Sequence, residues 1–158
     1  MAVVAGTCEF SEANGRARVF ALCELQDKPV LTPVSMAGET SIRGMRCIDR
    51  ERRLVFHMSR LPSTMIRAYI GLRINRNLDL SRGGPYSLNL KLDSGEVKSM
   101  SLQAPPPDLG NRYALMAVMT RTGDDWNVGR LVAGTEFYVD RPALSAVRPV
   151  PPWWTRHA

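Results

Sequence analysis

The sequence contains few of the residues that carry enzyme chemistry. Its 158 residues include two histidines and three cysteines. It has no serine in a glycine-flanked nucleophile elbow, no phosphate-binding P-loop and no glycine-rich dinucleotide fingerprint. His57 lies in a stretch that alternates like a strand, and we interpret it as structural, because catalysis would require a nucleophile beside it. We therefore expect a protein that is not an enzyme and that uses no cofactor.

Cysteine pairs are missing as well. Cys8, Cys23 and Cys47 are odd in number and far apart in the chain, which argues against a disulfide framework and against zinc ligation. Each lies in an apolar or alternating stretch, where a free cysteine usually packs as a small hydrophobe. We expect three buried thiols in a reducing compartment.

Long apolar runs are absent, so we expect no membrane span, because a spanning helix needs roughly 18 such residues. The first residues lack the charged n-region of a secretory signal, and Glu9 and Glu12 interrupt their apolar stretch. The 44% hydrophobic share is that of an ordinary globular protein, and 158 residues suit one domain. A cytoplasmic location is the expectation.

Lysine is scarce although the chain is basic, with a net charge of +6. Lys28, Lys91 and Lys98 are the lysines among 21 basic residues, which leaves 18 arginines. The planar guanidinium group suits phosphate and carboxylate. The arginines are spread along the chain, so a solvated basic surface is favoured over a nucleic-acid footprint.

The sequence does contain a clear period of two. Residues 86–92 and 97–102 alternate strictly around Asp93-Ser94-Gly95, which predicts a β-hairpin. Residues 113–119 are continuously apolar, as in a central strand, and a turn at 123–125 leads into residues 126–132. Other expected strands cover residues 2–10, 16–23, 45–49, 54–58 and 65–74. Residues 65–74 could also be a helix, but their β-branched and aromatic side chains favour a strand.

About nine strands with little helical signal indicate one fold class. We predict an all-β, single-domain β-sandwich of two packed, mostly antiparallel sheets over residues 1–147. Residues 141–147 could form a short helix after Asp140.

Residues 148–158 form a tail rich in proline and tryptophan. The prolines favour an extended chain that loses little entropy when it docks. Trp153 and Trp154 either fold back onto one end of the sandwich or anchor a partner protein, since tryptophan is enriched at binding hot spots. The sequence leaves both readings open.

Three parts of the chain together resemble a known family. Residues 54–62 and 66–72 are similar to a part of that family in which a strand is followed by a Ser-Lys-Leu-Pro corner and a second strand. Residues 94–97, Ser-Gly-Glu-Val, lie where that family has a hairpin turn. Residues 113–121 and 123–126 are similar to its late hairpin with a Gly-Glu-Trp turn. The family is TerD, the tellurite-resistance and chemical-stress β-sandwich proteins of bacteria, and the resemblance covers roughly residues 15 to 135.

The resemblance implies a β-sandwich of two packed sheets with two acidic loops that bind calcium in the family. Carbonyl and carboxylate ligands suit calcium, but this chain has Arg50 and Arg52 at positions of the second loop. The first loop falls near Arg16 and Arg18. A guanidinium supplies no oxygen ligand and repels a divalent cation. We therefore expect a divergent member that lacks the acidic calcium loops and binds no metal.

The reversed charges predict a site for partners instead. In the family's geometry these arginines, with Arg43 and Arg46, would cluster at one end of the sandwich and contact phosphate, an acidic loop or an anionic assembly surface. Alternatively, they pair with local acids. The partner-binding residues that we expect are Arg50, Arg52, Arg16, Arg18, Trp153 and Trp154.

The function that the resemblance implies is a non-enzymatic binding or assembly module of a bacterial stress or tellurite-resistance system. It would act through protein partners or assembly subunits. The alternative is a nucleic-acid-binding β domain whose scattered arginines contact phosphates. Phosphate contacts weaken steeply as salt rises, which separates the two.

Overall fold

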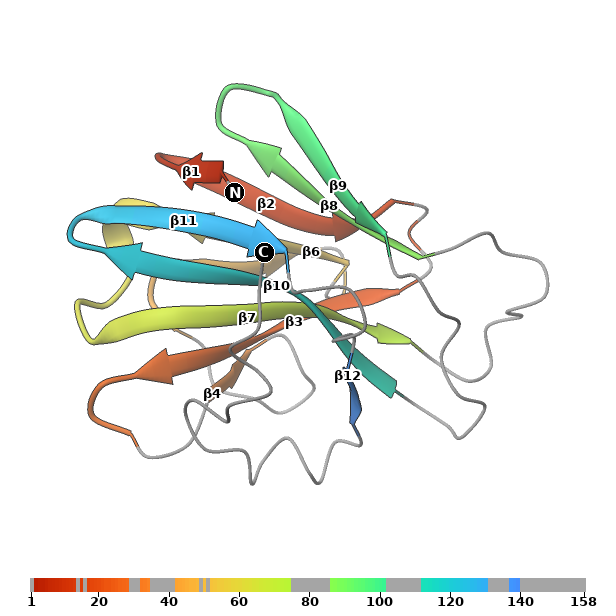
Figure 1. Ribbon diagram of the computed structural model, residues 1–158, viewed down its shortest axis with the longest axis horizontal. Coiled ribbons are helices and arrows are strands. Elements are labelled where there is room, and N and C mark those ends of the chain that lie inside the picture. The colour runs from red at the N-terminus through yellow and green to blue at the C-terminus, as the bar shows by residue number, and fades with distance from the viewer. Residues whose placement is uncertain are drawn as a thin grey trace.

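The alternating segments form strands in the computed structural model of the chain (Figure 1). The structure describes residues 2–13, 15, 17–28, 32–34, 42–48, 50, 52–74, 86–101, 112–130 and 137–139. Within these ranges it contains twelve strands and one short 3-10 helix, η1 (Met58–Arg60). The predicted all-β class is confirmed.

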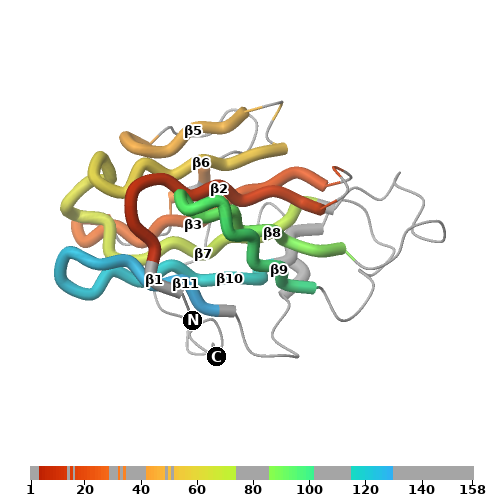
Figure 2. Tube along the Cα trace, turned by 90° about the horizontal axis from the view of Figure 1, so that it is seen from above, coloured from red at the N-terminus to blue at the C-terminus, as the bar shows by residue number. Residues whose placement is uncertain are grey.

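Two antiparallel sheets form the two layers (Figures 1 and 2). The first sheet has seven strands, in the order β1 (Ala2–Val4), β11 (Asp125–Arg130), β10 (Arg112–Thr122), β7 (Met65–Ile74), β3 (Arg18–Leu25) and β4 (Thr32–Val34), with β12 (Phe137–Val139) also paired to β10. The second has five, in the order β5 (Met45–Ile48), β6 (Arg53–His57), β2 (Thr7–Glu12), β8 (Ser87–Leu92) and β9 (Val97–Ser101). The predicted β-sandwich of two packed sheets is therefore confirmed.

The first expected strand, residues 2–10, is two strands in the structure. The extended segment is interrupted at Ala5 and Gly6, so that β1 joins the seven-stranded sheet and β2 joins the five-stranded sheet. Composition shows that such a segment is β-rich, but the change of sheet depends on partners elsewhere in the chain.

The long apolar segments lie where the seven-stranded sheet is most covered. β10 pairs with β7 on one side and β11 on the other, and Leu115 to Met119 are all at most 3% exposed. The ambiguous segment is a strand, β7, hydrogen-bonded to both β10 and β3. β-branched and aromatic residues in it thus pack as sheet formers.

Both hairpins predicted from turn residues are present. β8 and β9 pair from Ser87↔Ser101 to Lys91↔Val97, and β10 and β11 pair up to Thr122↔Asp125. These are local contacts, so short-range alternation and turn chemistry were enough to predict them.

Side chains from both sheets meet in one core. Phe10 and Phe56 are fully buried and pack edge to face, with ring centroids 5.7 Å apart and an interplanar angle of 78°. The Cys23 thiol of the seven-stranded sheet lies 3.8 Å from the Met45 sulfur of the five-stranded sheet. Trp126 of β11 is 2% exposed, and the Arg121 guanidinium lies over its ring at 4.9 Å.

A charged pair is buried on the seven-stranded sheet. Arg67 Nη1 donates to Glu24 Oε1 at 3.0 Å, directly across the β3–β7 pairing. The Glu24 side chain is 5% exposed and that of Arg67 is 25% exposed. Burial raises the pKa of the neighbouring Tyr69 hydroxyl, and the positive charge of Arg67 opposes that rise. The carboxylate of Glu24 therefore depends on Arg67 for its counter-charge.

The expectation that all three cysteines are buried is wrong for one of them. Cys8 and Cys23 are buried, whereas Cys47 is exposed. Cys47 belongs to β5, an edge strand of the five-stranded sheet that Figure 2 shows at one side of the molecule. Edge position removes the cover that a central strand receives, and alternation alone does not reveal it.

We predict that one thiol per chain reacts with a disulfide reagent in the native protein at pH 8. Burial raises the pKa of Cys8 and of Cys23 from 9.0 to about 12, so both remain protonated and shielded, and the thiolate is the reactive form. Colorimetric titration should count one fast thiol, and three in guanidinium chloride. Cys47→Ala should abolish the fast phase; three fast thiols in the native protein would contradict this burial.

Two of the predicted segments lie outside the described residues. These are the helix over 141–147 and the tail over 148–158, so the division of the chain into residues 1–147 and 148–158 stays a prediction. In the part of the chain that the structure describes, no helix is long and apolar enough to cross a bilayer.

Candidate functional site

The turn between β5 and β6 carries two of the predicted site residues. Arg50 and Arg52 are both exposed, and the Arg52 amide donates to the Ile48 carbonyl at 3.2 Å, which closes the turn. Arg50 has a φ of 56° and is the one non-glycine residue with positive φ among those described. That conformation costs about 1–2 kcal/mol, and the hairpin around it holds it in place. Asp49 and Glu51 lie outside the described residues.

The loop between β2 and β3 meets this turn. A Cβ placed on Gly15 would lie 3.7 Å from Nη1 of Arg52, so the guanidinium of one loop lies over the backbone of the other. Arg18 is exposed at the start of β3, whereas Arg16 lies outside the described residues. The two loops that the resemblance compares with the calcium loops are thus neighbours.

A calcium ion does not fit the residues described at this junction. The group that reaches from the β5–β6 turn to Gly15 is the Arg52 guanidinium, which has donors and a positive charge but no ligand oxygen. Within the described ranges, no three His, Cys, Asp or Glu side chains gather as metal ligands. That the whole chain binds no calcium stays a prediction.

The expectation that six arginines cluster at one end is wrong. Arg43 precedes β5 and Arg50 follows it, so the two lie at opposite ends of that strand. Arg46 lies within β5, opposite Val55. The hairpin separates the arginines into one group near the β5–β6 turn and another at the start of β5.

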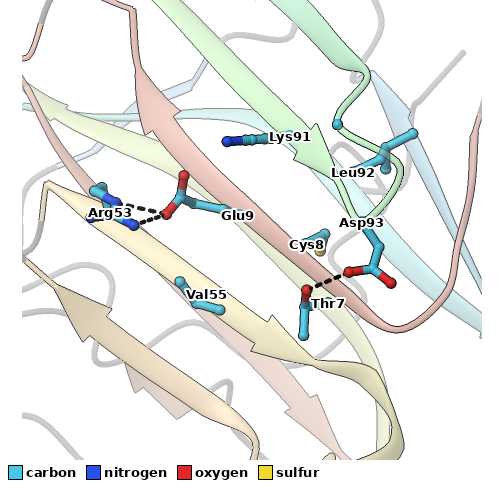
Figure 3. Close-up of a pocket in the computed structure, with 9 residues that line it drawn as sticks. Thr7, Cys8, Glu9, Arg53, Val55, Lys91, Leu92 and Asp93 are labelled. Carbon is cyan, nitrogen blue, oxygen red and sulfur yellow. Dashed lines mark hydrogen bonds and ion pairs between the residues drawn. The ribbon is translucent and has the colours of Figure 1, made fainter.

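A shallow pocket of about 310 Å³ lies on the outer face of the five-stranded sheet (Figure 3). Two of its charged groups form an ion pair: Nε and Nη2 of Arg53 each lie 2.6 Å from Oε1 of Glu9. The Thr7 hydroxyl donates to Asp93 at 3.0 Å, and Lys91 lies opposite Glu9 on β8. We interpret this pocket as a paired, solvated sheet surface, which stabilises the sheet modestly.

A second cavity, of about 410 Å³, lies at the start of β5. We call it the arginine cavity; its lining residues are Arg43, Gly44, Met45, Arg46, His57 and Arg60. The residues come from the segment that leads into β5, from the end of β6 and from η1. Sequence analysis missed this site because no single stretch of the chain contains it.

Two more predicted site residues, Trp153 and Trp154, lie outside the described residues, as does Arg16. His57 is half-buried at the end of β6, and its backbone amide donates to the Gly44 carbonyl at 2.6 Å.

Comparison with known proteins supports the fold. No family model matches the sequence, and no curated protein matches it. Among solved structures, the chain is similar to a homologue of the telluride resistance protein TerD from Streptomyces coelicolor A3(2), with a TM-score of 0.57 and 12% sequence identity. The match covers 89% of this chain and 95% of that one. The fold that the sequence resemblance implied is therefore confirmed: the chain has a TerD-like β-sandwich.

Proposed function

We propose that this TerD-like sandwich is a non-enzymatic binding or assembly module of a bacterial stress or tellurite-resistance system. It acts by presenting charged loops to protein partners from a rigid pair of sheets. Two facts support the proposal: the similarity to a homologue of a telluride resistance protein, and the scarcity of residues suited to catalysis in the sequence. The TerD-like fold supplies the scaffold, and the loops supply specificity.

The observation that carries this proposal is the contact of Arg52 with the β2–β3 loop. It brings the two loops together, and we define the arginine surface as the exposed Arg50 and Arg52 of the β5–β6 turn with the exposed Arg18 at the start of β3. Arg50 and Arg52 make no ion pair with any described residue, so their guanidinium groups are free to bind carboxylates of a partner. Such charges steer association and select partners by complementarity.

A protein partner fits this surface better than nucleic acid does. Duplex nucleic acid presents a long row of phosphates and is matched by a basic stripe. The exposed arginines around β5 instead divide between the two ends of that strand. The tail with Trp153 and Trp154 is a second, apolar contact in this proposal, and its binding would tolerate salt.

We expect the double variant R50E/R52E to bind its protein partner at least tenfold more weakly than the unmodified chain does. It replaces attraction to an acidic surface by repulsion. The measurement is capture of partners from bacterial lysate by the full chain at low and high salt, identification by mass spectrometry, and titration of the purified partner. K28E/K98E is the matched control, since it makes the same change of charge at exposed lysines elsewhere and should retain the partner.

Each contrary result has a distinct meaning. Equal binding by R50E/R52E and the control would exclude the arginine surface as the partner site. Recovery of nucleic acid that is shed steeply with salt would favour the nucleic-acid alternative. A partner that survives high salt and is lost with Trp153→Ala would place the main contact on the tail.

A further inference from the structure

We propose that the arginine cavity is a binding site for a small phosphate-bearing anion, such as pyrophosphate or a phosphomonoester. The cavity lies at the start of β5, at the far end of that strand from Arg50 and Arg52. This inference goes beyond the proposed function and does not rest on it, because the two sites share no residue.

The walls of the arginine cavity are held together by backbone contacts. The His57 amide donates to the Gly44 carbonyl at 2.6 Å, and the Met45 amide donates to the Ile42 carbonyl at 3.1 Å. A Cβ on Gly44 would lie 2.9 Å from the carbonyl carbon of Arg60. The main chain of three segments therefore packs too closely for any side chain between them. The backbone around Gly44 is therefore held in place before a ligand arrives.

The cavity gathers three arginines, and among the described residues no acid pairs with them. None of Arg43, Arg46 and Arg60 makes an ion pair or a side-chain hydrogen bond with a described residue. Four described acidic residues are instead paired with residues outside the cavity. These pairs are Glu9 with Arg53, Glu24 with Arg67, Asp93 with Thr7, and Glu96 with Lys98. Three like charges around one cavity repel one another, and a bound anion would relieve that repulsion.

The donor chemistry of the lining suits phosphate. Each guanidinium presents five N–H donors in a planar fork that matches two oxygens of a phosphate group. His57 also lines the cavity, and its ring supplies a further nitrogen. Arg43, Arg46 and Arg60 carry three formal charges, which together match a dianion or trianion.

The size of the cavity favours a small molecule. About 410 Å³ lies within the range of ordinary ligand pockets, roughly 300–1,000 Å³. A nucleic-acid strand would need cations that continue along its backbone, whereas these arginines surround one concave site. We therefore propose that the ligand is a soluble phosphate compound. A phospholipid headgroup carries the same phosphate group and is the alternative that the test must distinguish.

The test is calorimetric titration of the full chain with pyrophosphate and with inorganic phosphate, in chloride buffer of matched ionic strength. We expect saturable binding of one pyrophosphate, weakened at least tenfold by R43Q and by R60Q. R50Q removes an arginine that is also exposed but lies at the other end of β5, and it should change the affinity less than twofold. Circular dichroism of each variant checks that the sheets are intact.

A second measurement maps the site without substitution. Phenylglyoxal modifies accessible arginines, and pyrophosphate should protect Arg43, Arg46 and Arg60 from it but leave Arg50 reactive, as read by peptide mass spectrometry. The proposal fails if no saturable heat appears up to about 10 mM pyrophosphate, a concentration well above a Kd of about 1 mM. It also fails if R50Q weakens binding as much as R60Q. It also fails if the chain binds vesicles containing phosphatidic acid but not soluble pyrophosphate, because the lipid would then be the ligand.

Discussion

Replacement of Gly44 by alanine is expected to lower the free energy of unfolding by about 2–4 kcal/mol. Gly44 has a φ of 88°, a conformation that L side chains rarely adopt. A Cβ there would also lie 2.9 Å from both the Arg60 carbonyl carbon and the Leu61 amide nitrogen. These are backbone atoms, so the clash is relieved only if β5 moves away from η1.

Gly95→Ala is the matched control for this prediction. Gly95 has a φ of 92°, and a Cβ there would meet nothing within 4 Å. Its substitution introduces the same backbone strain without a clash and should cost about 1 kcal/mol. Urea unfolding followed by circular dichroism measures both. Equal losses would show that the β5 segment does not pack closely on η1, and would remove the frame of the arginine cavity.

Replacement of Arg67 by methionine is expected to lower the free energy of unfolding by about 3–5 kcal/mol. Glu24, whose side chain is 5% exposed, would lose the guanidinium partner that lies 3.0 Å from its carboxylate. Burial of a charge without a counter-charge carries a desolvation penalty that no ion pair compensates. The same urea unfolding measures the loss.

Two further variants isolate the cause. Arg53→Met breaks a pair of similar geometry with Glu9, but those side chains are 43% and 21% exposed, so the expected loss is about 1 kcal/mol or less. The double variant E24M/R67M removes both charges and should recover most of the stability lost in R67M. A double variant as unstable as R67M would attribute the loss to packing and not to charge.

Much of the fold could be predicted from local patterns. The β8–β9 hairpin follows from strict alternation on either side of Asp93-Ser94-Gly95, and the pairing Lys91↔Val97 is only six residues apart in the chain. The apolar run in β10 predicted a central strand, because a strand covered on both faces has no polar side. Each inference needed only neighbouring residues.

The candidate site was predicted less well. The two loops that the resemblance compares with the calcium loops lie close together at Arg52 and Gly15, but the resemblance also placed Arg43 with them. A strand advances about 3.3 Å per residue, so Arg43, which precedes β5, and Arg50, which follows it, lie at opposite ends of that strand. The arginine cavity joins Arg43 to Arg60, and no spacing rule connects those positions.

The sequence by itself determined the class of this protein: an all-β chain with little lysine, few histidines, and strands marked by a period of two. Those properties are local, because alternation and turn residues act within a few positions. Only the tertiary structure decided that Cys47 is exposed, that Glu24 is buried against Arg67, and that Arg43, Arg46 and Arg60 surround one cavity. Burial and the sharing of a surface depend on strands far apart in the chain, whose order in a sheet no local pattern specifies.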